Sequence, residues 1–117
     1  MDEGTVIVAG PNLIFPNGKI LRLEFGVEAL VDFGDVIVVC LDVPPYVSYD
    51  ENVFGIAKDG SILWRIKPLR NAKGDSVRMR YVGCGRDGVF ARVNRWDGVL
   101  AFLDPRTGEV DHAVDAR

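Results

Sequence analysis

Apolar and polar residues alternate most regularly between residues 52 and 67, NVFGIAKDGSILWRIK, which contain an Asp-Gly step near their centre. Asp-Gly between two apolar arms is a strong signal for a β-hairpin with a tight type I′ turn, whose two central residues both need positive φ. In the second arm, Ile62, Trp64 and Ile66 occupy alternate positions, so they should share one face of the strand. We therefore predict a hairpin whose Trp64 side chain lies in the core.

The same order of apolar arm, glycine-containing turn and second arm occurs twice more. Residues 13–23 turn at an Asn-Gly step, and residues 99–114 turn through the segment DPRTG. Glycine adopts positive φ without the steric cost that other residues meet. We predict positive φ at the three turn glycines, Gly18, Gly60 and Gly108.

The rest of the chain also has the pattern of short strands. We predict two strands at residues 27–33 and 35–42, joined at a Gly-Asp step. The second contains the apolar run VIVVCL, which is typical of a central strand covered on both faces or of a core strand in a curled sheet. Residues 77–83 and 88–94 form a further pair around the turn CGRDG. No window keeps helical periodicity without an interrupting Gly or Pro. The prediction is a single all-β domain over residues 1–117, an antiparallel meander of about ten short strands packed as a sandwich, an open barrel or propeller-like sheets.

Composition is that of a soluble globular protein, with 48% hydrophobic and 26% charged residues. No apolar run approaches the roughly 20 residues of a membrane span, and two acids follow Met1 where a signal peptide would carry bases, so we expect a cytoplasmic protein with no membrane association. Reduced thiols are then expected at Cys40 and Cys84.

The net charge of −3 is distributed unevenly along the chain. Residues 1–60 contain ten acids and three bases, and residues 61–117 contain seven acids and eleven bases. This asymmetry either marks a charged binding face, or the acidic and basic halves lie on neighbouring strands and neutralise each other.

The segment VPPYVSYDE, residues 43–51, interrupts the strand pattern. Its two prolines cannot donate backbone hydrogen bonds, so we expect a stiff, exposed loop. Tyrosines on a stiff loop are ordered at low entropic cost and often anchor protein interfaces. We predict a partner-binding surface here; the alternative is that the tyrosines close over the core. Its residues are Tyr46, Tyr49, Asp50 and Glu51.

Arginines in the second half suggest another binding face. Arg78, Arg80 and Arg92 lie on the predicted strands 77–83 and 88–94, with aromatic residues nearby. Such a combination can bind single-stranded nucleic acid. A pI near 5.1 makes nucleic acid an unfavourable partner, because affinity for phosphates depends on concentrated positive charge.

Residues with catalytic potential are few. The chain has a single histidine, His112, and two cysteines, too few for a structural zinc site. The segment GCGRDG lies between two predicted strands and opens no helix, so it lacks the helix N-terminus that holds a pyrophosphate. We expect no cofactor, no metal ion and no catalysis.

Two resemblances bear on fold and function. DGSILWRI and LAFLDPRTGEV resemble the blade repeats of PQQ-like (quinoprotein) β-propellers, although 117 residues are too few for a closed ring, which needs at least four blades of about 40 residues each. Second, FPNGK, the DVPP loop, ENVFGI with DGSILW, and the final DG and DPRTG segments come in the order found in a family of short uncharacterised bacterial proteins, which resemble immunity proteins encoded beside secreted toxins.

The function predicted is therefore a non-catalytic protein-binding module. The second resemblance implies an immunity or inhibitor protein that neutralises a cognate bacterial toxin by direct binding. Nuclease toxins are basic, so an acidic inhibitor would gain association rate and specificity from complementary charge. The alternative is a small-ligand-binding or nucleic-acid-binding β domain, and the chain should be a monomer or a small homo-oligomer.

Overall fold

The computed structural model describes residues 4–70, 76–77 and 79–115, and these residues form thirteen strands and no helix. The all-β prediction is confirmed. A three-stranded sheet contains β1 (Ile7–Ala9), β2 (Asn12–Ile14) and β3 (Ile20–Arg22). A four-stranded sheet contains β4 (Val27–Asp32), β5 (Val36–Leu41), β6 (Val53–Ala57) and β7 (Ile62–Arg65). A second four-stranded sheet contains β10 (Tyr81–Asp87), β11 (Phe90–Arg95), β12 (Val99–Leu103) and β13 (Val110–Asp115). A short ribbon of β8 (Leu69–Arg70) and β9 (Ser76–Val77) joins the last two sheets.

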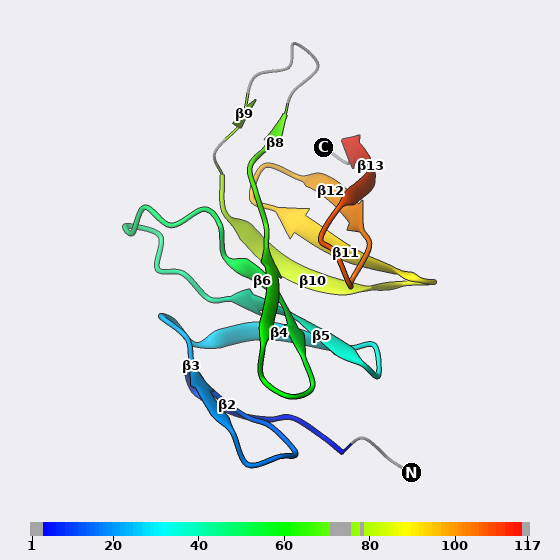
Figure 1. Cartoon of the computed structure of the whole chain (residues 1–117). Coiled ribbons are helices and arrows are strands. Elements are labelled where there is room, and N and C mark those ends of the chain that lie inside the picture. The colour runs from blue at the N-terminus through cyan, green and yellow to red at the C-terminus, as the bar shows by residue number, and fades with distance from the viewer. Residues whose placement is uncertain (1–3, 71–75, 78, 116–117) are drawn as a thin grey trace.

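Each of the three larger sheets is an antiparallel meander whose strands pair in chain order, and we call them blades 1, 2 and 3. They follow one another as in an arc, with blade 1 at one end, blade 2 in the middle and blade 3 at the other end (Figure 1). The arrangement is that of successive propeller blades and not of a closed barrel.

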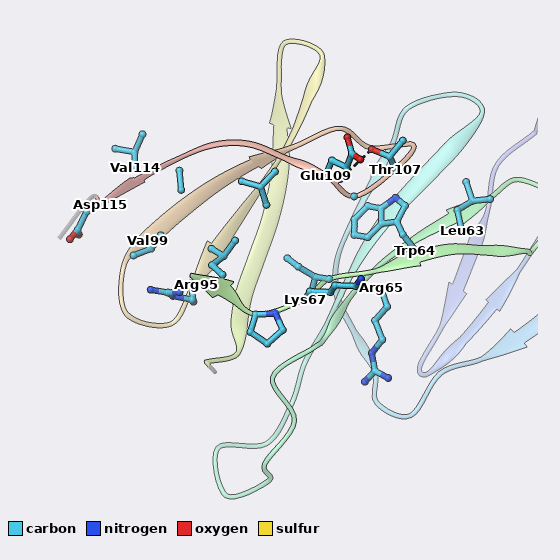
Figure 2. Close-up of a pocket in the computed structure, with 16 residues that line it drawn as sticks. Leu63, Trp64, Arg65, Lys67, Arg95, Val99, Thr107, Glu109, Val114 and Asp115 are labelled. Atoms are coloured by element: carbon cyan, nitrogen blue, oxygen red, sulfur yellow. Dashed lines mark hydrogen bonds between the residues drawn. The ribbon is translucent and has the colours of Figure 1, made fainter. Parts of the chain in front are cut away.

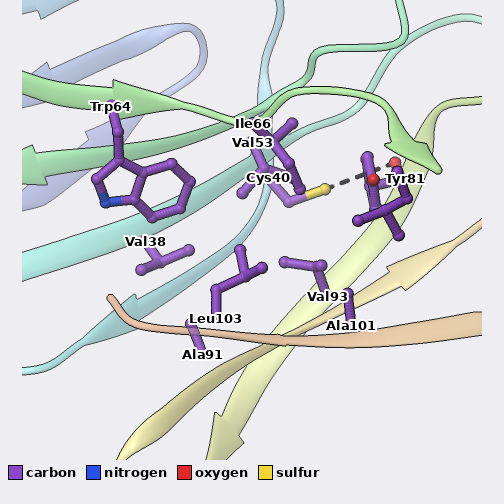
Figure 3. Packing of buried hydrophobic residues seen from close by; sticks show 11 residues of the cluster. Val38, Cys40, Val53, Trp64, Ile66, Tyr81, Ala91, Val93, Ala101 and Leu103 are labelled. Atoms are coloured by element: carbon purple, nitrogen blue, oxygen red, sulfur yellow. Dashed lines mark hydrogen bonds between the residues drawn. The ribbon is translucent and has the colours of Figure 1, made fainter. Parts of the chain in front are cut away.

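Blade 2 is covered on both faces, and this explains the continuous apolar run of β5. Every residue of β5 is buried. Ile37, Val39 and Leu41 pack in a cluster with residues of blade 1, whereas Val38 and Cys40 pack in a cluster with residues of blade 3. Figure 3 shows the second cluster, in which side chains of blade 2 meet those of β10, β11 and β12. The prediction of a central strand covered on both sides is confirmed.

The three repeated turns contain the predicted glycines with positive φ. The values are 88° at Gly18, 91° at Gly60 and 76° at Gly108. The type I′ prediction is wrong, however, because no described residue other than glycine has positive φ. At Asp59-Gly60 the amide of Gly60 donates to the carbonyl of Ala57, and the amide of Ala57 donates to the carbonyl of Ser61. This is a three-residue loop in which an ordinary turn is followed by a left-handed glycine.

Trp64 is buried as predicted and connects blade 2 to blade 3. Its indole Nε1 donates to the carbonyl of Pro105 at 2.8 Å. The ring lies against two glycines, because a Cβ at Gly55 or Gly108 would come within 2.7 Å of it. The prediction that Ile62 shares its face is wrong, since Ile62 is 49% exposed. A bulge in β7 places two of its residues opposite one of β6, and this shifts the alternation between Ile62 and Trp64.

The predicted turn at CGRDG is also wrong. β10 begins at Tyr81 and continues through Asp87, and the chain reverses at Gly88, whose φ is 59°. Cys84 and Gly85 are therefore strand residues paired with Val93 and Arg92 of β11. Glycines at positions 83 and 85 misleadingly suggested a loop, because glycine is depleted in ordinary strands.

Candidate functional site

The connection between β5 and β6, residues 43–51, forms an exposed loop that we call the proline loop. Its first residue, Val43, is buried, and the amide of Val47 donates to the carbonyl of Pro44 at 3.0 Å, which closes a turn. Tyr46 lies within this turn and is 87% exposed. The exposed tyrosine and the two prolines agree with the loop that the sequence predicts.

Arg80 fixes the shape of the proline loop. Its Nη1 donates to the carbonyls of Val43 and Pro44 at 2.7 and 2.6 Å. Its Nη2 donates to the carbonyls of Pro45 and Val47 at 3.1 and 2.8 Å. A planar guanidinium with five fixed donors can satisfy several carbonyls at once, and a lysine cannot reproduce that geometry.

The two surfaces predicted from the sequence are therefore partly one site. Arg80 precedes β10 and contacts the proline loop instead of lying on a strand face, and Arg78 lies outside the described residues. Arg92 is separate: on β11 it covers Gly85 and donates from Nε to Asn94 Oδ1 at 3.3 Å. The predicted arginine face is not assembled in the described part of the chain.

Tyr49 packs partly against the core, as the alternative expectation had it. Its hydroxyl donates to Glu24 Oε1 at 3.3 Å, and its ring meets the edge of Phe25 with centroids 5.0 Å apart. The guanidinium of Arg65 lies 4.9 Å from the centre of the Tyr49 ring. Burial raises the pKa of Tyr49, which therefore stays neutral at physiological pH. The residue as a whole is half-buried.

Asp50 and Glu51 complete the loop and are both half-buried. The backbone carbonyl of Glu51 accepts a hydrogen bond from Arg65 Nε at 2.7 Å, so Arg65 holds both this end of the loop and the Tyr49 ring. The Arg65 guanidinium therefore lies close to the predicted acidic patch.

Elsewhere, Arg106 and Asp35 form a bidentate ion pair with both distances 2.9 Å, which joins the acidic and basic halves of the chain. The uneven charge along the sequence is thus partly neutralised in three dimensions.

A cleft of about 450 Å³ lies beside the proline loop, and we call it the aromatic cleft. Trp96 forms part of its wall and is 66% exposed. The amide of Trp96 donates to the carbonyl of Arg80 at 2.9 Å, so Arg80 holds the tryptophan through its backbone and the proline loop through its side chain. The lining residues are Pro45, Val47, Ser48, Tyr49, Asp50, Met79, Arg80 and Trp96.

Asn52 supports the base of the site from within. It is fully buried, and its Nδ2 donates to the carbonyls of Leu41 at 3.0 Å and Tyr81 at 2.7 Å. Its Oδ1 accepts from the amide of Tyr81 at 2.9 Å. The side chain thus joins the end of β5 to the start of β10, next to Arg80. In the sequence, the one signal of this role is a polar residue directly before the apolar run VFGI.

A larger groove of about 1060 Å³ runs between the outer strands β7 and β13 (Figure 2). The Trp64 ring lies under the turn that carries Thr107 and Glu109, and Val114 lies at the far end of the groove. This groove follows the gap between two blade edges, and its tryptophan is already used to join the blades. The aromatic cleft is the better candidate site because Trp96 in its wall is 66% exposed and Tyr46, on the adjoining proline loop, is 87% exposed.

Neither histidine nor cysteine lies at the aromatic cleft. His112, on β13, stacks on Phe102 with centroids 4.5 Å apart, and its Nδ1 is 2.7 Å from Asp111 Oδ2. Burial raises the pKa of the Cys84 thiol to about 11 and raises that of Cys40 further, so both are protonated at neutral pH. Among the described residues, no group of three or more His, Cys, Asp or Glu side chains is placed to hold a metal ion. Within the same residues, no helix is long and apolar enough to cross a bilayer.

Comparison with known proteins gives one family. The family described as "Domain of unknown function (DUF7957)" matches residues 6–114. The chain belongs to this family. No curated protein matches the DUF7957 chain.

Two solved structures share the fold of this DUF7957 chain. The computationally designed Ika8 protein superposes with a TM-score of 0.63 at 15% identity, over 97% of this chain and 35% of that one. BamB from Moraxella catarrhalis, a β-propeller, superposes with a TM-score of 0.60 at 22% identity, over 96% and 34%. The chain thus spans about a third of the length of either structure. At these identities the likeness shows the propeller-blade-like fold alone.

Proposed function

We propose that this DUF7957 chain is a non-catalytic protein-binding module whose binding surface is the proline loop together with the aromatic cleft. The observation that carries the proposal is the set of four hydrogen bonds from Arg80 to the loop carbonyls. A loop that is already fixed loses little conformational entropy when a partner binds, and this raises affinity.

The exposed aromatic residues support the same proposal. Tyr46 lies on the proline loop, which the Arg80 side chain holds, and Trp96 lies on the turn after β11, whose backbone is hydrogen-bonded to Arg80; both side chains are exposed. Tryptophan, tyrosine and arginine are the residue types most often found to dominate binding energy at protein interfaces. Pro45 and Met79 are apolar residues in the lining of the cleft, against which one side chain of a partner would pack.

The sharper form of the proposal is an immunity protein that blocks a bacterial toxin. It is supported by the resemblance described above and by the acidic net charge of −3, which would speed association with a basic toxin domain. Arg65 and Arg80 lie at the site and offset its acidic residues. We therefore assign the affinity for the partner to the aromatic residues, and expect the net negative charge of the chain to affect mainly the rate of association. The nucleic-acid alternative gains no support, since the guanidinium of Arg80 is engaged by four carbonyls.

Co-expression with a toxin encoded in the same gene cluster tests the proposal. The parent protein should restore growth and bind the toxin domain, whereas the double variant Tyr46→Ala with Trp96→Ala should lose protection through faster dissociation. Val89→Ala is the matched control, because Val89 is an exposed apolar residue at the turn between β10 and β11. Absence of binding by the parent would overturn the immunity proposal. Full protection by the double variant would remove the aromatic cleft as the binding site.

A further inference from the structure

The groove between β7 and β13 lies where blades 2 and 3 separate. The inner strands of the two blades approach each other, β4 and β5 against β10. The Trp64 indole joins the outer parts of the blades by its hydrogen bond to the carbonyl of Pro105, and beside this joint is the groove of about 1060 Å³. Small-ligand sites usually measure roughly 300 to 1,000 Å³, so this groove has room for a short segment of polypeptide.

The β7 wall of the groove is an open strand edge. In the part of the chain that the structure describes, β7 pairs with β6 alone and β13 with β12 alone. The amide of Ile66 donates to the carbonyl of Val53 at 2.9 Å, so the backbone of Ile66 points toward β6. Successive residues of an antiparallel strand direct their backbone groups to opposite sides, and the amide and carbonyl of Arg65 therefore point to the open edge. Such an edge is a template for a further strand.

The two walls of the groove run in the same direction, away from the Trp64 joint. The Trp64 ring lies against Gly108, just before β13 begins, and Val99 and Val114 lie at the opposite end (Figure 2). Residues 63–69 line one wall without interruption, a length of about 23 Å if extended. A segment that enters antiparallel to β7 is therefore antiparallel to β13 as well.

Two exposed charges of opposite sign give the groove a polarity. Glu109 lies at the Trp64 end, and Lys67 lies farther along the β7 wall (Figure 2). Among the residues with described positions, neither side chain has an ion-pair partner. The other charged residues of the lining already take part in interactions; they are Arg65, Arg95 and Asp115. In a segment antiparallel to β7, an acidic residue against Lys67 comes before a basic residue against Glu109.

We propose that this groove binds an extended segment of a partner protein by strand addition to β7. The segment runs antiparallel to β7 and has an acidic residue, then alternating apolar residues, then a basic residue. Its backbone pairs with the open edge at Arg65, and its apolar side chains pack toward Ile66 and Val99 in the lining. The proposal uses none of the exposed aromatic residues of the aromatic cleft, so it stands or falls independently of the proposed function.

Two seven-residue peptides of identical composition, capped at both ends, test the groove. Thr-Glu-Val-Thr-Val-Lys-Thr has the proposed order of charges, and Thr-Lys-Val-Thr-Val-Glu-Thr has the reverse order. Binding is followed by the amide chemical shifts of the ¹⁵N-labelled protein, with millimolar peptide at low ionic strength. The first peptide should shift the amides of residues 63–67 and bind roughly fivefold more tightly than the second, because exposed ion pairs contribute modestly.

A charge-swapped protein checks that the preference arises in the groove. Lys67→Glu combined with Glu109→Lys should fold, because both side chains are exposed, and it should prefer the second peptide by a similar factor. Arg22→Glu combined with Glu28→Lys is the matched control, because these two exposed residues do not line the groove, and it should keep the preference of the parent.

Three results would each overturn the proposal. The first is that neither peptide shifts the amides of residues 63–67. The second is that the parent binds both peptides equally, or that the charge-swapped protein keeps the preference of the parent. The third is that the shifts fall on β13 while the Arg65 amide is unaffected, since this would exclude pairing with β7.

Discussion

Replacement of Arg80 is the most informative single change. Each hydrogen bond from a charged donor contributes roughly 1.5 to 3 kcal/mol when its acceptor cannot find another partner. The four loop carbonyls lie at a half-exposed site where water can replace the guanidinium, so the total loss should be far less than the sum. We expect Arg80→Lys to lower the free energy of unfolding by about 2 kcal/mol, or the melting temperature by roughly 8 °C for a domain of this size.

The assay combines urea unfolding with amide hydrogen exchange. In Arg80→Lys the amide of Val47, which closes the turn around Tyr46, should exchange faster, while the amides of β5 should keep their protection. Arg22→Lys, an exposed arginine on β3, serves as the control for the change of side chain. If Arg80→Lys keeps the stability and the Val47 protection of the parent, the four-carbonyl geometry does not fix the loop, and the argument for a preorganised surface fails.

Three further predictions concern the joints between blades. Gly108→Ala should lower the free energy of unfolding by about 3 kcal/mol more than Gly18→Ala does. Both glycines have positive φ, but a Cβ at Gly108 would also meet the Trp64 ring at 2.6 Å, whereas a Cβ at Gly18 would meet nothing within 4 Å. Equal losses of stability in urea unfolding would contradict this packing. Trp64→Ala should cost roughly 3 to 5 kcal/mol, and a variant that melts within a few degrees of the parent would show that Trp64 does not join the blades. Cys40 and Cys84 should resist alkylation at pH 8 in the folded protein and react fully in urea, because Cys40 is buried, Cys84 is half-buried, and desolvation raises both pKa values. Rapid labelling of the native protein would contradict the raised pKa values.

Sequence patterns predicted the fold best where one physical cause dominated. Continuous apolarity in β5 predicted a strand covered on both faces, since burial on both sides leaves no position for a polar residue. The turn glycines were predictable because few other residues adopt positive φ. The type I′ turn was wrong because the Asp-Gly signal is shared by the three-residue loop with a left-handed glycine, and the two differ only in the φ of the aspartate.

Failures arose where tertiary contacts override local pattern. Nothing in SILWRI shows the bulge that exposes Ile62, because its cause is the pairing with Gly55 and Ile56 of β6. The role of Arg80 depends on carbonyls 33 to 37 residues away, and backbone carbonyls leave no trace in a sequence. The loop residues could be predicted as a candidate site from prolines and tyrosines, but Trp96 joins them only through the path of the chain after β11.

The central claim, that the proline loop and the aromatic cleft bind a protein partner, is tested most directly by an amide-exchange footprint. The protein is compared alone and in complex with the toxin domain encoded in its gene cluster. The account predicts that slowed exchange is concentrated in residues 43–51 and 95–98, with little change along β7, β13 or the strands of blade 1. Protection confined to the groove between β7 and β13, or to a blade face, with the proline loop unchanged, would contradict it.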